Sequence, residues 1–459
     1  MSLTPPTRTT SGDKFGSRVG FILAAAGSAV GLGNIWRFPY MTAENGGAAF
    51  VLLYLGCVLL IGIPVLLAEL AMGRASGKNA VGAYEALDPD RSKRWRWAGG
   101  LGVVTGLAIL AFYSVVAGWT LSYTWRALTG TFARSMSPAE SGALFESIIG
   151  SPTESVAMTG AFLLLTAVVV RGGVSGGIER ASKVLMPAFF VVLAVLAVRA
   201  LMLPGAGAGV RFLLEPDFSE ITGVSIMSAM GQALFSLSLG MGGMITYGSY
   251  LQKHERIGIA GASVAFFDTT VAITAGLMVF PTLFAVGVDP GKGGPGLVFV
   301  AMPTIFESLP AGQAFGVAFF ALLVVAAWTS TISLLEVVVA YLVGERGWKR
   351  ETSVWVTTAV CFVLAVPSAL SQGAVPALGE EGLGRSFLDL MSIVFGNVSL
   401  TLGALVTALF VGWRWGAKKA LAEMNGLPFA ALWSVLIRVV CPLATAGVMV
   451  YILVTGNFF

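Results

Sequence analysis

Long apolar runs recur from one end of this chain to the other, and they constrain its fold more than any other feature. Of the 459 residues, 56% are hydrophobic and only 11% are charged, whereas a soluble domain carries roughly 25% charged residues. A helix that crosses a bilayer needs about 20 apolar residues. We therefore predict an all-α polytopic membrane protein with eleven transmembrane helices. The segments are 18–41, 46–72, 97–127, 154–171, 177–202, 222–251, 257–287, 311–344, 351–370, 385–413 and 427–455.

Lysine and arginine are distributed unequally between the loops on the two sides. If the N-terminus is cytoplasmic, twenty of the 28 basic residues fall in cytoplasmic loops and six fall in outer loops. Cytoplasmic loops carry the excess of basic residues in membrane proteins. We therefore predict a cytoplasmic N-terminus and, after eleven spans, a C-terminus outside. The polar N-terminal residues do not resemble a cleaved signal peptide, so the first span is expected to stay.

Several function classes are disfavoured by the rare residue types. Cys57, Cys361 and Cys441 all fall inside apolar segments, which predicts neither disulfides nor a metal site. The single histidine, His254, sits in a short charged loop. An intramembrane enzyme needs a nucleophile–base pair or a metal, and the sequence offers neither. The basic residues gather at membrane boundaries, so the net charge of +4 does not indicate a nucleic-acid partner.

The first apolar segment contains features that a plain membrane anchor would lack. Its stretch GSAVGLGNIWRFPY (Gly27–Tyr40) carries three glycines, Asn34 and Arg37. Glycine loosens a helix by about 1 kcal/mol relative to alanine. An arginine at membrane depth is costly unless it faces a cavity or a partner. The stretch therefore predicts a broken helix that lines a binding site near the midplane.

The sixth segment contains a similar glycine-rich stretch, SLSLGMGGM (Ser236–Met244). The two stretches lie in the first spans of two consecutive five-span blocks, and because five is odd the second block enters the membrane in the opposite sense. Interrupted segments at corresponding positions of inverted halves indicate a transporter site. The alternative is helix packing through small residues, since Gly27 and Gly31 have the GxxxG spacing.

We treat the chain as one transporter domain, 1–459, built from two repeats and an additional helix. The first repeat covers about 18–202, the second covers about 222–413, and the eleventh helix covers about 427–455. Between spans, Ser137–Gly150 opens with a helix-start signal and predicts a short surface helix. Gly291–Pro310 predicts a re-entrant or capping hairpin on the outside, and Ala417–Met424 predicts a short interfacial helix.

Three long motifs resemble the neurotransmitter:sodium symporter family. They are GSAVGLGNIWRFPY followed by NGGAAF (Asn45–Phe50), then GQALFSLSLGMGGMITYGSY (Gly231–Tyr250), then AAWTSTISLLE (Ala326–Glu336). The resemblance covers nearly the whole chain. It implies the LeuT-like 5+5 inverted-repeat fold, with helices 1 and 6 unwound at the midplane. It also implies a bacterial amino-acid transporter of the inner membrane that works by alternating access.

The resemblance further implies two bound sodium ions that are transported with the substrate. The first would be held by Ala29, Asn34, Ser236 and Asp268 together with the substrate carboxylate. The second would be held by Gly27, Val30, Ala326, Thr329 and Ser330. For Thr329 and Ser330 the alternative is a hydroxyl that bonds back to its own helix.

Asp268 departs from the better-known family pattern. Eukaryotic members have Asn at this position and need chloride, and some bacterial members place a Glu one turn later, where this chain has Ala272. An aspartate at 268 supplies the negative charge itself, so we predict transport with no chloride requirement. Alternatively, hydroxyls such as those of Thr269 and Thr270 satisfy the carboxylate.

The implied substrate site lies between the two helix breaks. Monoamine carriers of the family place an aspartate where Gly31 stands, so here the substrate is expected to bring its own carboxylate. The apolar lining predicts a neutral, hydrophobic or aromatic L-amino acid. A proton-coupled carrier that uses Asp268 or Glu336, an osmolyte or amine carrier, and a sensor or channel on the same fold remain alternatives. The implied site residues are Ser28, Ala29, Leu32, Gly33, Ile109, Tyr113, Phe235, Ser236, Ser238, Met241, Ser330 and Leu334.

Two gates are expected around this site. Arg37 and Asp389 are isolated charges in apolar segments, so we predict that they pair as the external gate above a lid of Tyr113 and Phe235. The alternative for Arg37 is an anchor that reaches the interface. We expect Glu69 to hydrogen-bond the unwound part of the sixth span.

The cytoplasmic gate departs from the family pattern. The usual gate positions read Gly12, Phe15 and Gly344, and the substitutes nearby are Lys14, Arg18 and Glu345. In span five, Gly177 and Pro187 match a pattern that lets this helix unwind in related transporters. An ordinary proline kink is the alternative.

Overall fold

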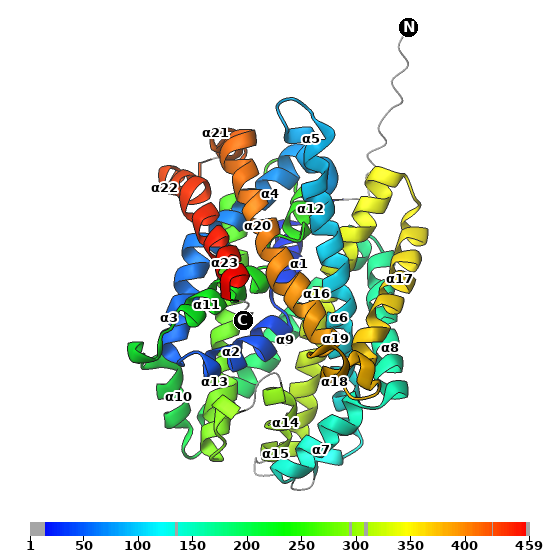
Figure 1. The fold of residues 1–459 in the computed structure, drawn as a ribbon, viewed down its shortest axis with the longest axis vertical. Helices are drawn as coiled ribbons and strands as arrows, with labels where there is room; N and C mark the ends of the chain where they lie inside the picture. The colour runs from blue at the N-terminus through cyan, green and yellow to red at the C-terminus, as the bar shows by residue number, and fades with distance from the viewer. Residues whose placement is uncertain (1–13, 134–135, 293–295, 307–310, 425, 456–459) are drawn as a thin grey trace.

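The computed structural model describes residues 14–133, 136–292, 296–306, 311–424 and 426–455. Throughout these ranges the chain is a bundle of helices without a strand (Figure 1). Nine helices there are long and apolar enough to span a membrane. The all-α prediction is therefore confirmed. These spans are Ala48–Ser76, Lys93–Leu128, Pro152–Arg171, Val174–Leu201, Ile257–Ala285, Gly312–Arg346, Arg350–Leu370, Phe387–Met424 and Ala430–Val454.

The first and sixth predicted spans are both interrupted. In the first, Arg18–Ala29 and Gly33–Glu44 meet at an angle of 45°. In the sixth, helices Gly223–Ser236 and Gly243–Ser249 are separated by residues 237–242. The two breaks fall at the glycine-rich stretches where the sequence predicts them.

The helices of the first predicted repeat follow the expected order. They are α1 (Arg18–Ala29), α2 (Phe38–Glu44), α3 (Ala48–Cys57), α4 (Ile63–Ser76), α5 (Ala80–Leu87), α6 (Arg96–Leu128), α7 (Pro138–Ile149), α8 (Pro152–Arg171) and α9 (Arg180–Leu201). Single π-helical turns continue some of them, such as Val58–Gly62 between α3 and α4.

The remaining helices are α10, which lies between the two predicted repeats, and those of the predicted second repeat and the last span. They are α10 (Ala206–Leu214), α11 (Gly223–Ser236), α12 (Gly243–Ser249), α13 (Ile257–Ala285), α14 (Leu297–Val300), α15 (Pro303–Phe306), α16 (Gly312–Arg346), α17 (Arg350–Leu370), α18 (Glu380–Leu383), α19 (Phe387–Met391), α20 (Leu400–Leu409), α21 (Ala417–Met424), α22 (Ala430–Val435) and α23 (Cys441–Thr455).

The short helices predicted between spans are also present. A capping box starts α7, in which Ser137 Oγ accepts the Glu140 N–H and Glu140 Oε2 accepts the Ser137 N–H. The predicted hairpin, Gly291–Pro310, contains α14 and α15, and its residues 293–295 and 307–310 lie outside the described ranges. Helix α21 follows directly on the π-helical turn Phe410–Gly416, so no loop separates it from the tenth span.

The short connecting helices lie at two opposite ends of the bundle. Helices α5 and α21 lie at one end of the bundle, and α7, α10, α14 and α15 lie at the other (Figure 1). We call the first of these the basic end, because the lysine- and arginine-rich loops gather there. Between the two ends, α6 and α16 run side by side along much of their length.

Candidate functional site

The break in the first span frees backbone groups, and side chains satisfy them. Helix α1 ends where Val30 takes an extended conformation, with φ −75° and ψ 103°. The Gly31 N–H then donates to Asn34 Oδ1 at 3.0 Å, and the Leu32 N–H donates to the Tyr113 hydroxyl at 2.9 Å. At the break, side-chain oxygens therefore take the place of the helix carbonyls as acceptors for two N–H groups.

The break in the sixth span is held by helices on both sides. Ser238, Gly240 and Gly242 have positive φ angles of 55°, 80° and 74°. The Gly240 N–H donates to Glu69 Oε1 at 2.8 Å, which is the contact expected for this glutamate. A Cβ at position 240 would lie 2.1 Å from the Leu400 carbonyl oxygen, so only glycine fits against α20.

A hydrogen bond joins the two breaks directly. The Ser238 hydroxyl donates to the Ser28 carbonyl oxygen at 2.8 Å. The glycine-rich stretches of the two predicted repeats, about 200 residues apart in the sequence, therefore form one continuous polar region inside the bundle.

Buried oxygens converge at Asn34, between α1, α11 and α13. The Asn34 Nδ2 lies 2.7 Å from Asp268 Oδ1, 3.1 Å from the Asp268 carbonyl oxygen and 3.0 Å from Ser236 Oγ. Ser236 Oγ also donates to Asp268 Oδ1 at 2.7 Å, and the Tyr54 hydroxyl donates to Oδ2 at 3.0 Å. Neutral oxygens beside one carboxylate are the ligands that a small hard cation prefers.

The donors to Asp268 differ from one alternative raised by the sequence. In the described part of the chain, its carboxylate bonds to Asn34, Ser236 and Tyr54, and no bond from Thr269 or Thr270 to it is found. Tyr54 was not predicted. It lies in an otherwise ordinary apolar span, and no local signal marks it.

The second predicted ion site gathers around Thr329 on α16. Its hydroxyl lies 3.0 Å from the Ala326 carbonyl oxygen and 3.3 Å from the Val30 carbonyl oxygen. A Cβ at Gly27 would lie 3.3 Å from Thr329 Cβ. Bonding within the helix is present too, with the Val325 carbonyl oxygen at 3.2 Å. The structure thus brings Gly27, Val30, Ala326 and Thr329 together.

A small cavity lies beside these two oxygen clusters. Eleven of the twelve predicted substrate residues line it, together with Gly31 and Leu400. The exception is Leu32, which is buried and contributes its backbone N–H to Tyr113. Leu400 was not predicted, because one leucine in the long apolar tenth span gives no signal. The lining residues are Ser28, Ala29, Gly31, Gly33, Ile109, Tyr113, Phe235, Ser236, Ser238, Met241, Ser330, Leu334 and Leu400.

The free volume of this cavity is about 20 Å³. That is room for about one water molecule. Ser330 and Tyr113 fill the space beside the first break, where a Cβ at Gly31 would lie 2.2 Å from Ser330 Oγ. The structure therefore shows the cavity in a contracted, closed state.

The predicted ion pair between Arg37 and Asp389 is not formed. Arg37 Nη1 donates to Gln232 Oε1 at 3.3 Å, Nη2 donates to Asn397 Oδ1 at 3.1 Å, and the guanidinium carbon lies 4.8 Å from the centre of the Phe235 ring. The buried arginine therefore packs on the cavity wall, and no carboxylate among the described residues lies at hydrogen-bonding distance from it.

Asp389 has a different local role. It is exposed in the first turn of α19, where its N–H donates to Ser386 Oγ at 3.1 Å and its Oδ2 accepts from the Ser386 hydroxyl at 2.6 Å. The charge was predicted to be isolated inside an apolar span. It instead stabilises the N-terminus of α19.

Aromatic rings pack together between the cavity and the basic end. The Phe15 ring lies 5.4 Å from Phe21, 5.7 Å from Tyr247 and 6.2 Å from Tyr250, centroid to centroid. The Tyr250 hydroxyl donates to Glu336 Oε1 at 2.6 Å, and Arg350 also bonds this glutamate. These contacts fix the segment before α1 against α12 and α16.

A carboxylate on span five holds the same segment. Glu179 accepts the Gly16 N–H at 2.6 Å and the Ser17 hydroxyl at 2.8 Å, and it pairs with Lys183 at 2.6 Å. No signal in the sequence indicated this contact. The stretch from Gly177 to Pro187 is helical here.

The substitutes suggested for the cytoplasmic gate do not pair with one another. Arg18 lies 3.6 Å from Glu255, whereas Glu345 pairs with Arg96 at 2.6 Å. A Cβ at Gly344 would meet the side chain of Asn79. Gly12 lies outside the described residues.

Comparison with known proteins gives a consistent result. The sequence pattern described as "Sodium:neurotransmitter symporter family" matches residues 12–140 and 143–457. A sodium-dependent transporter of Bacillus subtilis is 39% identical, over 94% of this chain and 95% of the relative. A human sodium- and chloride-dependent GABA transporter is 25% identical, over 88% of this chain and 73% of the relative.

The fold is also similar to a solved structure. The crystal structure of MhsT in complex with L-phenylalanine matches with a TM-score of 0.89 and 44% sequence identity, covering 95% of this chain and 99% of that protein. The predicted LeuT-like fold is therefore confirmed.

Proposed function

Because this chain belongs to the sodium:neurotransmitter symporter family of sodium-dependent membrane transporters, we propose that it imports neutral, hydrophobic L-amino acids together with sodium by alternating access. The observation that carries this proposal is the closed cavity between the two helix breaks. Its wall contains apolar side chains, hydroxyls and backbone groups but no charged side chain. Such a wall suits a ligand that is neutral overall and apolar at one end.

The backbone at the first break suits the carboxylate of an amino acid. The N–H groups of Gly31 and Leu32 stand just before the helix that continues at Gly33, where the helix dipole favours negative charge. At present they donate to Asn34 and Tyr113. A carboxylate can replace these acceptors, and the Tyr113 hydroxyl is then free to donate to it.

The side-chain end of the substrate would face Ile109, Met241, Leu334 and Leu400. Methionine adapts to ligands of different shape. MhsT, which is 44% identical to this chain, was crystallised with L-phenylalanine. This neighbour supports aromatic and branched amino acids as the first candidates. Binding would require movement of the lid residue Phe235, because the closed cavity is too small for any amino acid.

We assign two sodium ions to the oxygen clusters. The first would bind among Ala29, Asn34, Ser236 and Asp268 after the Asn34 amide turns its oxygen inward. The second would bind among Gly27, Val30, Ala326, Thr329 and Ser330. Asp268 gives the first site a fixed negative charge, and on this ground we propose that transport needs no chloride.

We also propose a bacterial inner-membrane location with a cytoplasmic N-terminus, which places the basic end inside the cell. In this orientation Arg37 closes the outer side through Gln232, Asn397 and Phe235. Phe15 and Glu179 close the inner side. Alternating access then consists of breaking one of these two sets of contacts at a time.

Uptake into proteoliposomes tests the proposal. We expect accumulation of radiolabelled L-phenylalanine under an inward sodium gradient and none under a potassium gradient. Competition by a panel of amino acids, amines and betaines identifies the substrate class. Replacement of chloride by gluconate should leave the rate unchanged.

Three outcomes would contradict these assignments. Accumulation driven by a pH gradient without sodium would favour proton coupling through Asp268 or Glu336. Competition by amines or osmolytes alone would contradict the carboxylate site at Gly31 and Leu32. Binding without accumulation would indicate a sensor.

A further inference from the structure

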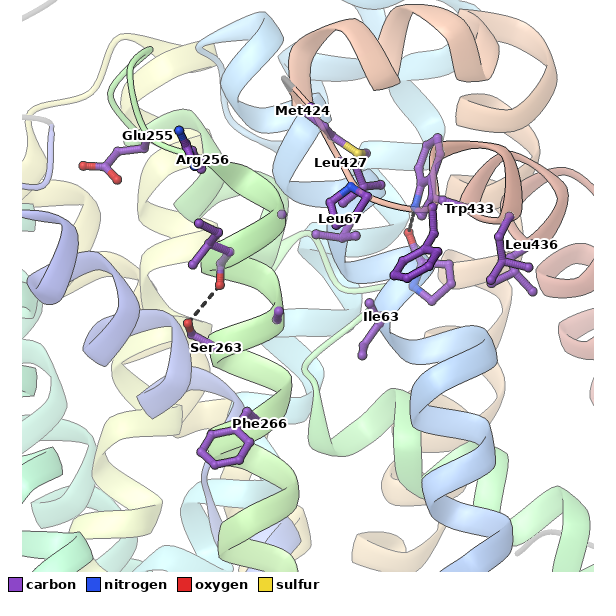
Figure 2. A pocket seen from close by; sticks show the side chains of 18 of the residues that line it. Ile63, Leu67, Glu255, Arg256, Ser263, Phe266, Met424, Leu427, Trp433 and Leu436 are labelled. Carbon is purple, nitrogen blue, oxygen red and sulfur yellow. Dashed lines mark hydrogen bonds between the residues drawn. The ribbon is translucent and has the colours of Figure 1, made fainter.

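A second and much larger hollow lies outside the transport pathway, at the basic end. It has a volume of about 1130 Å³ and runs between α4, α13 and the segment that joins α21 to α22. Small-molecule pockets usually enclose about 300–1,000 Å³. Figure 2 shows Ile63 and Leu67 on one wall and Phe266 and Ser263 on the other, with Trp433 beside them.

The walls of this groove are apolar and face outward from the bundle. Phe266 is 65% exposed, Leu432 is 55% exposed and Ile259 is 43% exposed. They belong to helices long and apolar enough to span the membrane. An occupant at this depth therefore has to be apolar where it contacts them.

The end of the groove that lies beyond these apolar walls carries an excess of positive charge. Lys253, His254 and Arg256 line it. Lys253 is largely exposed while it contacts Glu423, and Arg256 forms no ion pair with any described residue. Glu255 is the carboxylate of this loop, and it is already shared between Arg18 at 3.6 Å and His254 at 3.4 Å.

The second nearby carboxylate is also engaged. Glu423 accepts from the buried Arg74 at 2.9 Å as well as from Lys253 at 3.2 Å. Figure 2 shows the Glu255 carboxylate directed away from Ile63 and Trp433. Among the residues that line the groove, Lys253 and Arg256 therefore exceed the single carboxylate, Glu255.

We propose that this groove binds an anionic phospholipid of the cytoplasmic leaflet. Its phosphate would lie against Lys253 and Arg256, and an acyl chain would extend along Ile63 and Phe266 toward the midplane. An apolar channel that ends in a basic rim at the membrane boundary has the two chemistries of such a lipid in the right order. The rim is cytoplasmic in the orientation proposed above.

The groove adjoins the first ion cluster through a single helix. Phe266 and Phe267 line the groove, and Asp268 follows them on the buried side of α13. A lipid chain packed on one face of α13 therefore supports the helix that carries Asp268 on the other. Bound lipid should raise the thermal stability of the protein.

Native mass spectrometry of the purified full-length protein tests the proposal. Palmitoyl-oleoyl phosphatidylglycerol is titrated against phosphatidylcholine with the same chains. We expect tighter binding of phosphatidylglycerol. The double substitution Lys253→Gln/Arg256→Gln should weaken phosphatidylglycerol binding about 25-fold, because each basic residue near a membrane surface contributes about fivefold. It should weaken phosphatidylcholine binding much less, because the choline ammonium offsets the charge of that lipid's phosphate. Lys93→Gln/Arg94→Gln, which removes two exposed charges at the same end, is the matched control.

A second variant tests the groove itself. Ala262 is an exposed lining residue, and Ala262→Trp should displace both lipids, whereas Val184→Trp on the exposed face of α9 should not. Thermal unfolding shows that each variant is folded. Equal binding of the two lipids, or equal losses in both double variants, would overturn the proposal. So would a dimer that Ala262→Trp converts to monomer without loss of lipid.

Discussion

Glu179 ties the segment before α1 to the start of the fifth span, and its removal should favour opening at the basic end. The carboxylate is buried and accepts hydrogen bonds from Gly16 and Ser17. If the cytoplasmic half of α1 moves during transport, both bonds must break. Glu179→Gln keeps the shape of the side chain and removes its charge. The variant therefore measures how much the charge strengthens the hydrogen bonds to Gly16 and Ser17.

The size of the effect follows from the contacts. Hydrogen bonds to a charged acceptor contribute about 1.5–3 kcal/mol, and neutral ones contribute about 0.5–1.5 kcal/mol. Loss of the charge therefore weakens each bond by about 1 kcal/mol. The ion pair with Lys183 adds little, because the lysine is 44% exposed. The sum of about 2 kcal/mol corresponds to a shift of about 30-fold toward the inward-open state.

Cysteine accessibility measures this shift. Ala24 on α1 is 2% exposed, and Ala24→Cys is introduced after replacement of the three native cysteines. The reporter is labelled with an impermeant maleimide from the basic side, in saturating sodium. We expect labelling about 30-fold faster in Glu179→Gln, in line with the population shift.

Glu351→Gln is the matched control, because its ion pair with Arg171 lies at the same end and is exposed on both sides. It should leave the rate unchanged. A rate for Glu179→Gln within about twofold of the parent, in protein with an intact unfolding transition, would refute the reasoning.

Three further predictions concern other contacts. Asp268→Asn should weaken sodium binding by several hundredfold, since a unit charge about 4 Å from the ion contributes about 4 kcal/mol; sodium titration of ligand binding checks this, and an unchanged sodium affinity would argue against the first ion site. Arg37→Gln should speed labelling of a cavity cysteine from the outer side, whereas Asp389→Asn should not; the reverse result would restore the Arg37–Asp389 pair. The hydrogen bond from Arg414 lowers the pKa of Asp88. The bond therefore stabilises the folded protein at pH values above the ordinary aspartate pKa near 3.9, and this stabilisation is lost as the pH falls through the lowered pKa of Asp88. Thermal scans should therefore show the largest deficit of Arg414→Gln at pH 7 and a shrinking deficit below about pH 4.

The sequence predicted the architecture well, because spans and helix breaks have local signatures. Apolar length marks the spans, and clustered glycines with polar neighbours mark the breaks at Gly31 and Gly240. The residues around the cavity could be named because the motifs that carry them are long. Each of these features can be recognised within some twenty residues of chain.

Contacts between distant spans had no such signature. Tyr54 reaches Asp268 and Glu179 reaches Ser17 across more than 160 positions. Asp389 shows the opposite case, because a signal in the neighbouring sequence accounts for its charge. Ser386 stands three residues before it, and this spacing is typical of a helix start. That signal explains the charge without a distant partner.

The hydrogen bond between Ser238 and Ser28 belongs to the part of the cavity that is built from backbone groups, and the apolar wall is built differently. The oxygens of the proposed ion sites are held by backbone breaks and by contacts such as that of Gly240 with α20, where a side chain would collide with main-chain atoms. The apolar wall is made by side chains on helices that stay intact, Ile109 on α6 and Leu334 on α16 among them. Mutations at a few wall positions can therefore change the substrate range of such a carrier during evolution. The ion coupling would stay the same, because it depends on the backbone breaks.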